Sequence, residues 1–147
     1  MTTTAVQTTQ LYRLYIKASP DEIWDAITKP EFTERYFYGA RIENTAAGHR
    51  SLGPNDDMWG EAEVTEFDPP RKLVHGWRSL YDPELAAEEE SRVTWEIEPQ
   101  SGGLCLLTVV HDQLEGAPKT AASVSGGWML VLSGLKTLLE TGQPLVG

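Results

Sequence analysis

The sequence predicts an α+β domain in which a curved antiparallel sheet wraps around one long C-terminal helix. Three observations predict this fold. Two short helical segments follow a first strand, residues 39–112 read as short strands joined by turns, and a long apolar segment lies near the end of the chain. An antiparallel sheet whose helices are segregated along the chain is an α+β arrangement. The length of 147 residues suits one domain with its own core.

The first strand is expected at residues 11–16, LYRLYI, where aromatic and aliphatic side chains dominate. Ser19 and Glu22 have the spacing of a capping box, so a helix should begin there. This helix must be short, because the residue before Pro30 disfavours helical continuation. Pro30 suits the first turn of a second short helix, which is expected over residues 31–37.

Six strands with turn-length connections are expected after the short helices. Val93, Trp95 and Ile97 alternate with polar residues, which is typical of a strand with one buried face. The segment 104–111 is apolar on both faces, so it should be central in the sheet or packed on both sides. The expected strands are residues 41–45, 49–52, 58–67, 73–79, 93–98 and 104–111.

The final helix is expected from about residue 119 to residue 140, with Gly142 at the position of a C-terminal cap. Its apolar stripe should face Trp77 and Trp95 on the inner side of the sheet. No repeat or linker interrupts the chain. The domain organisation expected is therefore a flexible polar tail at residues 1–9 and a single domain at residues 10–147.

Composition excludes several classes of protein. The net charge of −10 argues against binding to nucleic acid or to an anionic membrane surface. The single cysteine excludes an internal disulfide framework. No signal peptide and no apolar run of about 20 residues is apparent, so a cytoplasmic location is expected. The sequence shows no His or Cys spacing for a metal and no nucleotide-binding motif, so no metal and no cofactor are expected.

An acidic segment, DPELAAEEES at residues 82–91, interrupts the pattern of strands. It is expected to form a loop, with room for one helical turn. One interpretation is a solvated loop. The other is a charged lip or a protein contact through Asp82–Glu90.

Several segments, taken in order, resemble the START-like (SRPBCC) superfamily and, within it, the branch named for the activator of Hsp90 ATPase, the AHSA1-like domains. The resemblance covers residues 10–144. It implies the helix-grip, Bet v 1-like fold, with a hydrophobic cavity between the curved sheet and the last helix. The segments that carry it are ASPDEIWDAIT at residues 18–28, GEAEVTEFDPP at 60–70, LVHGW at 73–77, VTWEI at 93–97, TVVH at 108–111 and GW at 127–128.

The expected cavity wall combines aromatic and aliphatic side chains with two histidines. His75 and His111 are expected to point inward, as satisfied core residues or as polar anchors for a ligand. His49 is assigned to a turn, without a role. The predicted ligand-binding residues are Tyr36, Phe37, Val64, His75, Trp77, Trp95, Leu107, His111, Trp128 and Leu132.

Three functions remain open at this point. The first is binding of a small hydrophobic or aromatic molecule in the cavity. The second is a cyclase- or aromatase-like enzyme with His75, His111 or Tyr36 as its acid or base, because such chemistry requires a proton donor or acceptor near the pocket. The third is a chaperone-related protein-interaction module. The sequence leaves catalytic residues and the oligomeric state unassigned.

Overall fold

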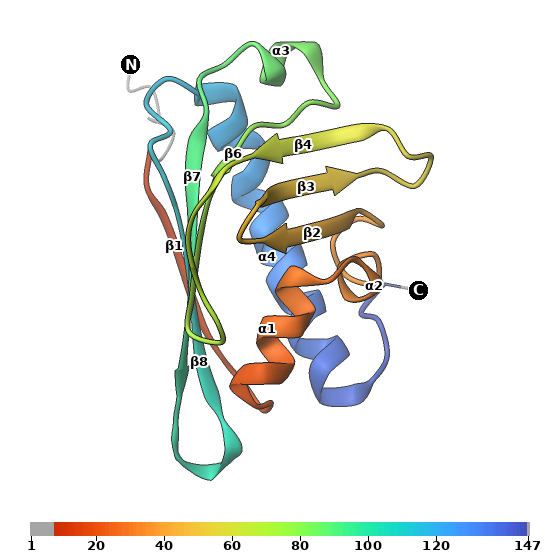
Figure 1. Ribbon diagram of the computed structural model, residues 1–147, viewed down its shortest axis with the longest axis vertical. Helices are drawn as coiled ribbons and strands as arrows, with labels where there is room; N and C mark the ends of the chain where they lie inside the picture. Colours follow the sequence, from red (N-terminus) through yellow and green to blue (C-terminus); the bar gives the residue numbers. More distant parts are fainter. Residues whose placement is uncertain (1–7, 147) are drawn as a thin grey trace, which may run out of the picture.

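The computed structural model describes residues 8–146 of the chain and confirms the α+β fold. A curved five-stranded antiparallel sheet and a separate three-stranded sheet lie around a long C-terminal helix (Figure 1). Residues 1–7 of the predicted tail lie outside the described residues. The elements are β1 (Gln10–Ile16), α1 (Pro20–Thr28), α2 (Pro30–Thr33), β2 (Arg41–Thr45), β3 (Gly48–Leu52), β4 (Met58–Ala62), β5 (Val64–Asp68), β6 (Lys72–Trp77), α3 (Pro83–Ala86), β7 (Ser91–Pro99), a 3-10 turn (Ser101–Gly103), β8 (Cys105–Asp112) and α4 (Pro118–Thr141).

The capping box at the start of α1 is present as predicted. The Ser19 hydroxyl accepts the backbone N–H of Glu22 at 3.1 Å, and the Glu22 carboxylate accepts the backbone N–H of Ser19 at 3.0 Å. Both contacts satisfy donors that the first helical turn leaves free. The helix therefore begins at a defined residue and buries Ile23, Trp24 and Ile27 against the core.

Helix α2 is shorter than predicted, because it ends at Thr33 instead of residue 37. The Thr33 hydroxyl accepts the backbone N–H of Ile42 at 2.8 Å and donates to the carbonyl of Ala40 at 2.9 Å. These two bonds turn the chain into β2. The aromatic residues that follow Thr33 consequently leave the helix and are free to line other surfaces.

The two sheets have the strand orders β1-β8-β7-β6-β5 and β2-β3-β4. The predicted single strand at residues 58–67 divides at Glu63, because β4 pairs with β3 whereas β5 pairs with β6. The carbonyl of Glu63 accepts the N–H of Gly76 at 3.0 Å, which holds the corner where the chain changes sheet. Residues 39–112 thus contain seven strands, one more than predicted. β8 is an interior strand between β1 and β7, whereas the central strand is β7.

Helix α4 packs one face against the five-stranded sheet, and its buried residues recur at intervals of three and four. Contrary to the sequence expectation, it is long and apolar enough to cross a membrane by length and composition. Its buried face belongs to the main core, together with the inward residues of β7 and β8, so it serves as the core helix. The buried α4 residues in that core are Val124, Trp128, Val131, Leu132, Leu135 and Leu138.

The acidic segment caps the start of α4. The residue before this helix, Ala117, offers no side-chain cap. Instead, the carboxylate of Glu88 accepts the backbone N–H groups of Lys119 at 2.9 Å and Thr120 at 2.7 Å, and the Thr120 hydroxyl at 2.7 Å. Burial alone would raise the pKa of Glu88, but these hydrogen bonds outweigh it and lower the pKa. The segment therefore has an intramolecular role that the sequence did not indicate.

Replacing the Glu88 carboxylate should destabilise the protein by removing this cap. We expect Glu88→Ala to lower the free energy of unfolding by about 1 kcal/mol, as other helix caps do. Urea denaturation at pH 7 would measure the change. The matched control is Glu89→Ala, because the Glu89 carboxylate makes no hydrogen bond within residues 8–146. Equal stability of the two variants would contradict the capping role.

Candidate functional site

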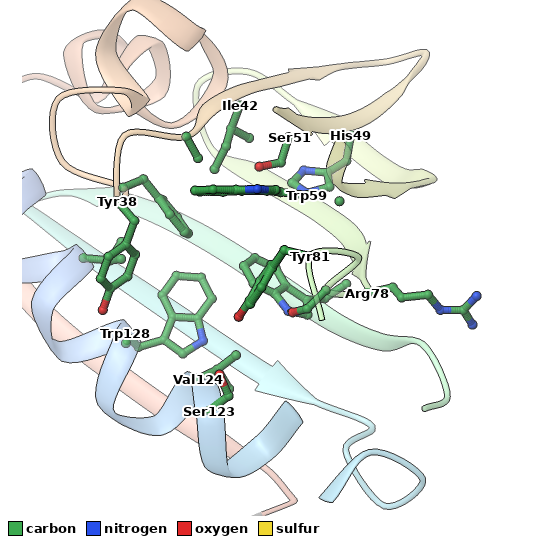
Figure 2. Close-up of a pocket in the computed structure, with 17 residues that line it drawn as sticks. Tyr38, Ile42, His49, Ser51, Trp59, Arg78, Tyr81, Ser123, Val124 and Trp128 are labelled. Carbon is green, nitrogen blue, oxygen red and sulfur yellow. The ribbon is translucent and has the colours of Figure 1, made fainter. Parts of the chain in front are cut away.

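A pocket of about 340 Å³ lies where α4, the three-stranded sheet and the segment after β6 meet (Figure 2). Its size falls within the range of small-molecule sites. Each of the three walls contributes aromatic rings. The lining residues are Phe37, Tyr38, Ala40, Ile42, His49, Ser51, Trp59, Gly60, Trp77, Arg78, Ser79, Tyr81, Ser123, Val124, Gly127, Trp128 and Val131.

Two groups of aromatic rings form the pocket walls. Trp77 and Trp128 have ring centroids 5.7 Å apart, and Phe37 lies 6.2 Å from Trp77 and 5.9 Å from Trp128. Trp59 and Tyr81, with centroids 5.9 Å apart, form the second group. Contacts among rings at these separations and tilted angles hold the walls in fixed positions. The pocket is therefore bounded by rigid, flat surfaces.

His111 is held by a chain of hydrogen bonds behind the Trp128 wall. The Trp128 indole N–H donates to His111 Nδ1 at 3.0 Å, so this nitrogen must be the unprotonated one. The proton then lies on Nε2, which donates to the Ser91 hydroxyl at 2.8 Å. Ser91 in turn donates to the carbonyl of Trp77 at 3.3 Å. Both ring nitrogens of His111 are thus occupied by the protein.

His75 is held in a similar way but as the other tautomer. Its Nε2 accepts the indole N–H of Trp95 at 3.1 Å, and its Nδ1 lies 2.8 Å from the carbonyl of Gly76. A carbonyl accepts only, so Nδ1 carries the proton. Both nitrogens of this imidazole are also engaged within the protein.

His49 lies in β3 with 5% of its surface exposed, which agrees with the strand predicted at residues 49–52 and shows that its assignment to a turn is wrong. Its ring stacks on that of His75, with centroids 4.1 Å apart and planes 6° from parallel. His49 Nδ1 lies 2.6 Å from the Asn44 side-chain oxygen, and the Asn44 amide donates to the carbonyl of Ile27 at 2.8 Å. This arrangement places the His49 proton on Nδ1. Nε2 is left with its lone pair and makes no hydrogen bond within residues 8–146.

All three histidines are neutral at neutral pH. Burial lowers the pKa of His75 to about 4 and that of His111 to about 3. For His111, the neighbouring His75 lowers the pKa further, whereas Asp112 raises it. Burial, reinforced by His75, also lowers the pKa of His49 well below 6.5. The pocket region therefore contains uncharged imidazoles that accept or donate single hydrogen bonds.

The structure places the predicted site residues in three positions. Phe37, Trp77 and Trp128 line the pocket. His75, Trp95 and His111 lie behind it and support it through hydrogen bonds or ring contacts. The remaining four do not line the pocket and belong to the surrounding core: Tyr36, Val64, Leu107 and Leu132.

The residues predicted from the sequence to bind a ligand do not include His49, Ser51 or Trp59. The signal for the first two is the hairpin of β2 and β3, in which Asn44 lies directly opposite His49. His49 and Ser51 are buried whereas Arg50 between them is exposed, which is the alternation of a half-buried strand.

Polar groups in the pocket are few and uncharged. Ser51 Oγ lies beside the imidazole of His49, the phenol hydroxyl of Tyr81 points toward the Trp128 side of the pocket, and the guanidinium of Arg78 points away from the pocket (Figure 2). The Ser79 hydroxyl already accepts one hydrogen bond within the protein, from the indole N–H of Trp77 at 3.2 Å. Among residues 8–146, no three His, Cys, Asp or Glu side chains are grouped as metal ligands.

Known structures share this fold. A protein from Mesorhizobium loti has a TM-score of 0.73 and 19% identity, covering 90% of this chain and 96% of its own. A protein in the dynemicin biosynthetic locus has a TM-score of 0.73 and 23% identity, covering 94% and 49%. An Hsp90 activator from Plasmodium falciparum has a TM-score of 0.72 and 18% identity, covering 94% and 99%. At these identities the likeness concerns the fold alone.

The family comparison agrees with the resemblance found in the sequence. No curated protein matches the chain. Residues 17–140 match the family model described as activator of Hsp90 ATPase homolog 1-like protein. This match spans α1 to α4, including every element that lines the pocket. The chain therefore belongs to the family of activator of Hsp90 ATPase homolog 1-like proteins, with their START-like (SRPBCC) fold.

Proposed function

We propose that the chain binds a small, uncharged, aromatic molecule in the pocket between α4 and the two sheets. The observation that carries this proposal is the pocket lining, in which aromatic rings on three walls surround a few neutral polar atoms. Flat rings bury much apolar surface at little entropic cost, and isolated polar atoms orient the bound molecule. A charged ligand would lack a counter-charge there.

The predicted site residues divide between two proposed roles. Phe37, Trp77 and Trp128 contact the ligand. His75 and His111 hold the tryptophans in position but do not anchor the ligand, because both nitrogens of each ring are already bonded within the protein.

Two adjacent glycines on α4 provide a matched test of this site. A Cβ added at Gly127 would point into the pocket, 3.6 Å from the Tyr38 hydroxyl, whereas one added at Gly126 meets nothing within 4 Å. We expect Gly127→Leu to fill the pocket and to weaken binding of 2-naphthol at least tenfold. Gly126→Leu should leave binding unchanged. Both changes favour the helix, so loss of folding does not explain a difference.

Quenching of tryptophan fluorescence or calorimetry would measure the 2-naphthol affinity of the three proteins. Thermal denaturation would verify that both variants fold. Equal weakening by both substitutions, or by neither, would contradict the proposed site. Native mass spectrometry of the gently purified protein, followed by organic extraction, would identify a resident ligand.

The cyclase-like alternative has less geometric support. Its predicted acids and bases do not face the pocket, because His75 and His111 are bonded within the protein and the Tyr36 hydroxyl donates to the carbonyl of Ala26 at 2.7 Å. Burial also raises the pKa of Tyr36 well above its usual value. Small-molecule binding therefore has the stronger basis in this site.

The protein-interaction alternative draws on the family name, which refers to an Hsp90 activator. A protein contact through the acidic segment stays a prediction. Two of its carboxylates are engaged with the start of α4, because Glu88 caps the helix and Glu84 lies 3.3 Å from the ammonium of Lys119. Deleting Asp82–Glu90 would therefore disturb the helix as well as any such contact.

A further inference from the structure

His49 differs from the other two histidines in having one nitrogen free at the pocket. Its ring is oriented from behind by Asn44, whose amide is fixed by the carbonyl of Ile27. The stacked ring of His75 fixes its tilt. Nε2 therefore carries a lone pair whose direction is set by two independent contacts. This acceptor faces the pocket, so a ligand donor that reaches it gains a hydrogen bond in a direction that is already fixed.

The space in front of His49 is kept open by Gly60. A Cβ added at this glycine would lie 4.0 Å from His49 Nε2 and 3.6 Å from the Cβ of Ser51. Because Gly60 carries no side chain, the imidazole nitrogen and the Ser51 hydroxyl border the same part of the pocket (Figure 2). Ser51 Oγ makes no hydrogen bond within residues 8–146, so it can donate to a ligand as well as accept from it.

We propose that His49 Nε2 accepts a hydrogen bond from a ligand hydroxyl, and that the ligand class is therefore a neutral phenol or another hydroxylated aromatic. A phenol fits both groups, because its O–H donates to His49 while its oxygen accepts from Ser51. A carboxylate or phenolate cannot donate a hydrogen bond to Nε2. Its negatively charged oxygen would face the lone pair of Nε2, which is unfavourable. This inference rests on the proposed small-molecule site.

Two probes that differ only in the hydroxyl test the inference. Calorimetry would compare the affinities for 2-naphthol and naphthalene. Because naphthalene is smaller, weaker binding of naphthalene cannot result from a steric clash in the pocket. We expect the protein to bind 2-naphthol about tenfold more tightly than naphthalene, as one additional hydrogen bond predicts. In His49→Phe, which keeps an aromatic ring on His75 but removes the acceptor, the preference should fall to the part that Ser51 supplies. In His49→Phe combined with Ser51→Ala, the two affinities should become equal.

Ser125→Ala is the matched control, because Ser125 is an exposed serine on α4 that is not part of the pocket lining. This variant should keep the preference for 2-naphthol. Equal binding of both probes to the unaltered protein would overturn the role of His49 and leave the proposed site intact. A preference that is undiminished in His49→Phe would do the same. Absence of binding for both probes would refute the proposed site itself.

A measurement on the unaltered protein covers the case in which His49→Phe does not fold. Nitrogen-15 NMR of the imidazoles distinguishes protonated from unprotonated ring nitrogens. We expect His49 Nε2 to be unprotonated in the free protein and its signal to shift when 2-naphthol is added, but not when naphthalene is added. A protonated Nε2 in the free protein would overturn the proposal.

Discussion

Acidification from pH 7 to pH 5 should destabilise the protein by about 4 kcal/mol through His75 and His111, and further through His49. Burial lowers the pKa of each imidazole in the folded state below the ordinary value of 6.5. The unfolded chain therefore binds more protons below that value, and stability falls as pH falls. Each histidine costs about 1.4 kcal/mol for each pH unit below 6.5, so the total approaches a typical whole-domain stability.

Urea denaturation at several pH values, followed by tryptophan fluorescence, would measure this slope. His75→Gln offers a control, because the glutamine side chain can still accept the Trp95 N–H but does not titrate. We expect its slope to be smaller by about 1.4 kcal/mol per pH unit. Glu88 and Glu140 have a lowered pKa in the folded protein. As pH falls, their stabilising contribution is lost only below the ordinary pKa of about 4.5, so it does not affect the slope between pH 7 and pH 5. A stability that is constant between pH 7 and pH 5 would show that the imidazoles titrate freely.

The largest effect of a single substitution is expected at Trp128. This side chain is 2% exposed, and its indole N–H is the donor to His111. Trp128→Ala should lower the free energy of unfolding by about 3–5 kcal/mol, because it leaves a cavity and an unpaired buried nitrogen. The indole contacts five other rings: Tyr12, Phe37, Trp77, Trp95 and His111.

Two further variants separate the packing of Trp128 from its hydrogen bond. Trp128→Phe keeps an aromatic ring but removes the donor, so it should cost about 1–3 kcal/mol for the unpaired His111 nitrogen plus a small packing loss. Met129→Ala changes the next residue, which is 61% exposed, and should alter stability by less than about 0.5 kcal/mol. Chemical denaturation of the three variants would give the comparison. A cost at position 128 no larger than that at position 129 would show that the ring is not part of the core.

Local signals were sufficient for most elements of the fold. The capping box at Ser19, the alternation of Val93, Trp95 and Ile97, and the glycine after α4 each depend on neighbouring residues, and each predicted its element. The corner at Glu63 could not be predicted in this way. The alternation of apolar and polar residues continues unbroken from β4 into β5. This alternation indicates which face of a strand is exposed to solvent, but not that β4 pairs with β3 and β5 with β6.

The candidate site could be predicted only in part, because its residues converge from separate elements. Trp77 and Trp128 were found because large apolar residues on a strand and on a helix must pack somewhere. His49 was missed because β3 is polar and short. Its burial depends on two partners distant in sequence, the β6 ring of His75 and the α1 carbonyl of Ile27 that fixes Asn44. The spacing of residues along the chain does not predict either of these two contacts.

The division into two sheets has a consequence for how this protein can evolve. Among residues 8–146, Trp77 is the one contribution of the five-stranded sheet to the pocket lining, whereas β2, β3 and β4 supply Ile42, His49, Ser51, Trp59 and Gly60. The main core, in contrast, is formed chiefly by the larger sheet and the helices. Under the proposed function, selection on ligand preference can therefore alter the smaller sheet while the larger one maintains folding. Members of such a family can diverge in specificity faster than in architecture.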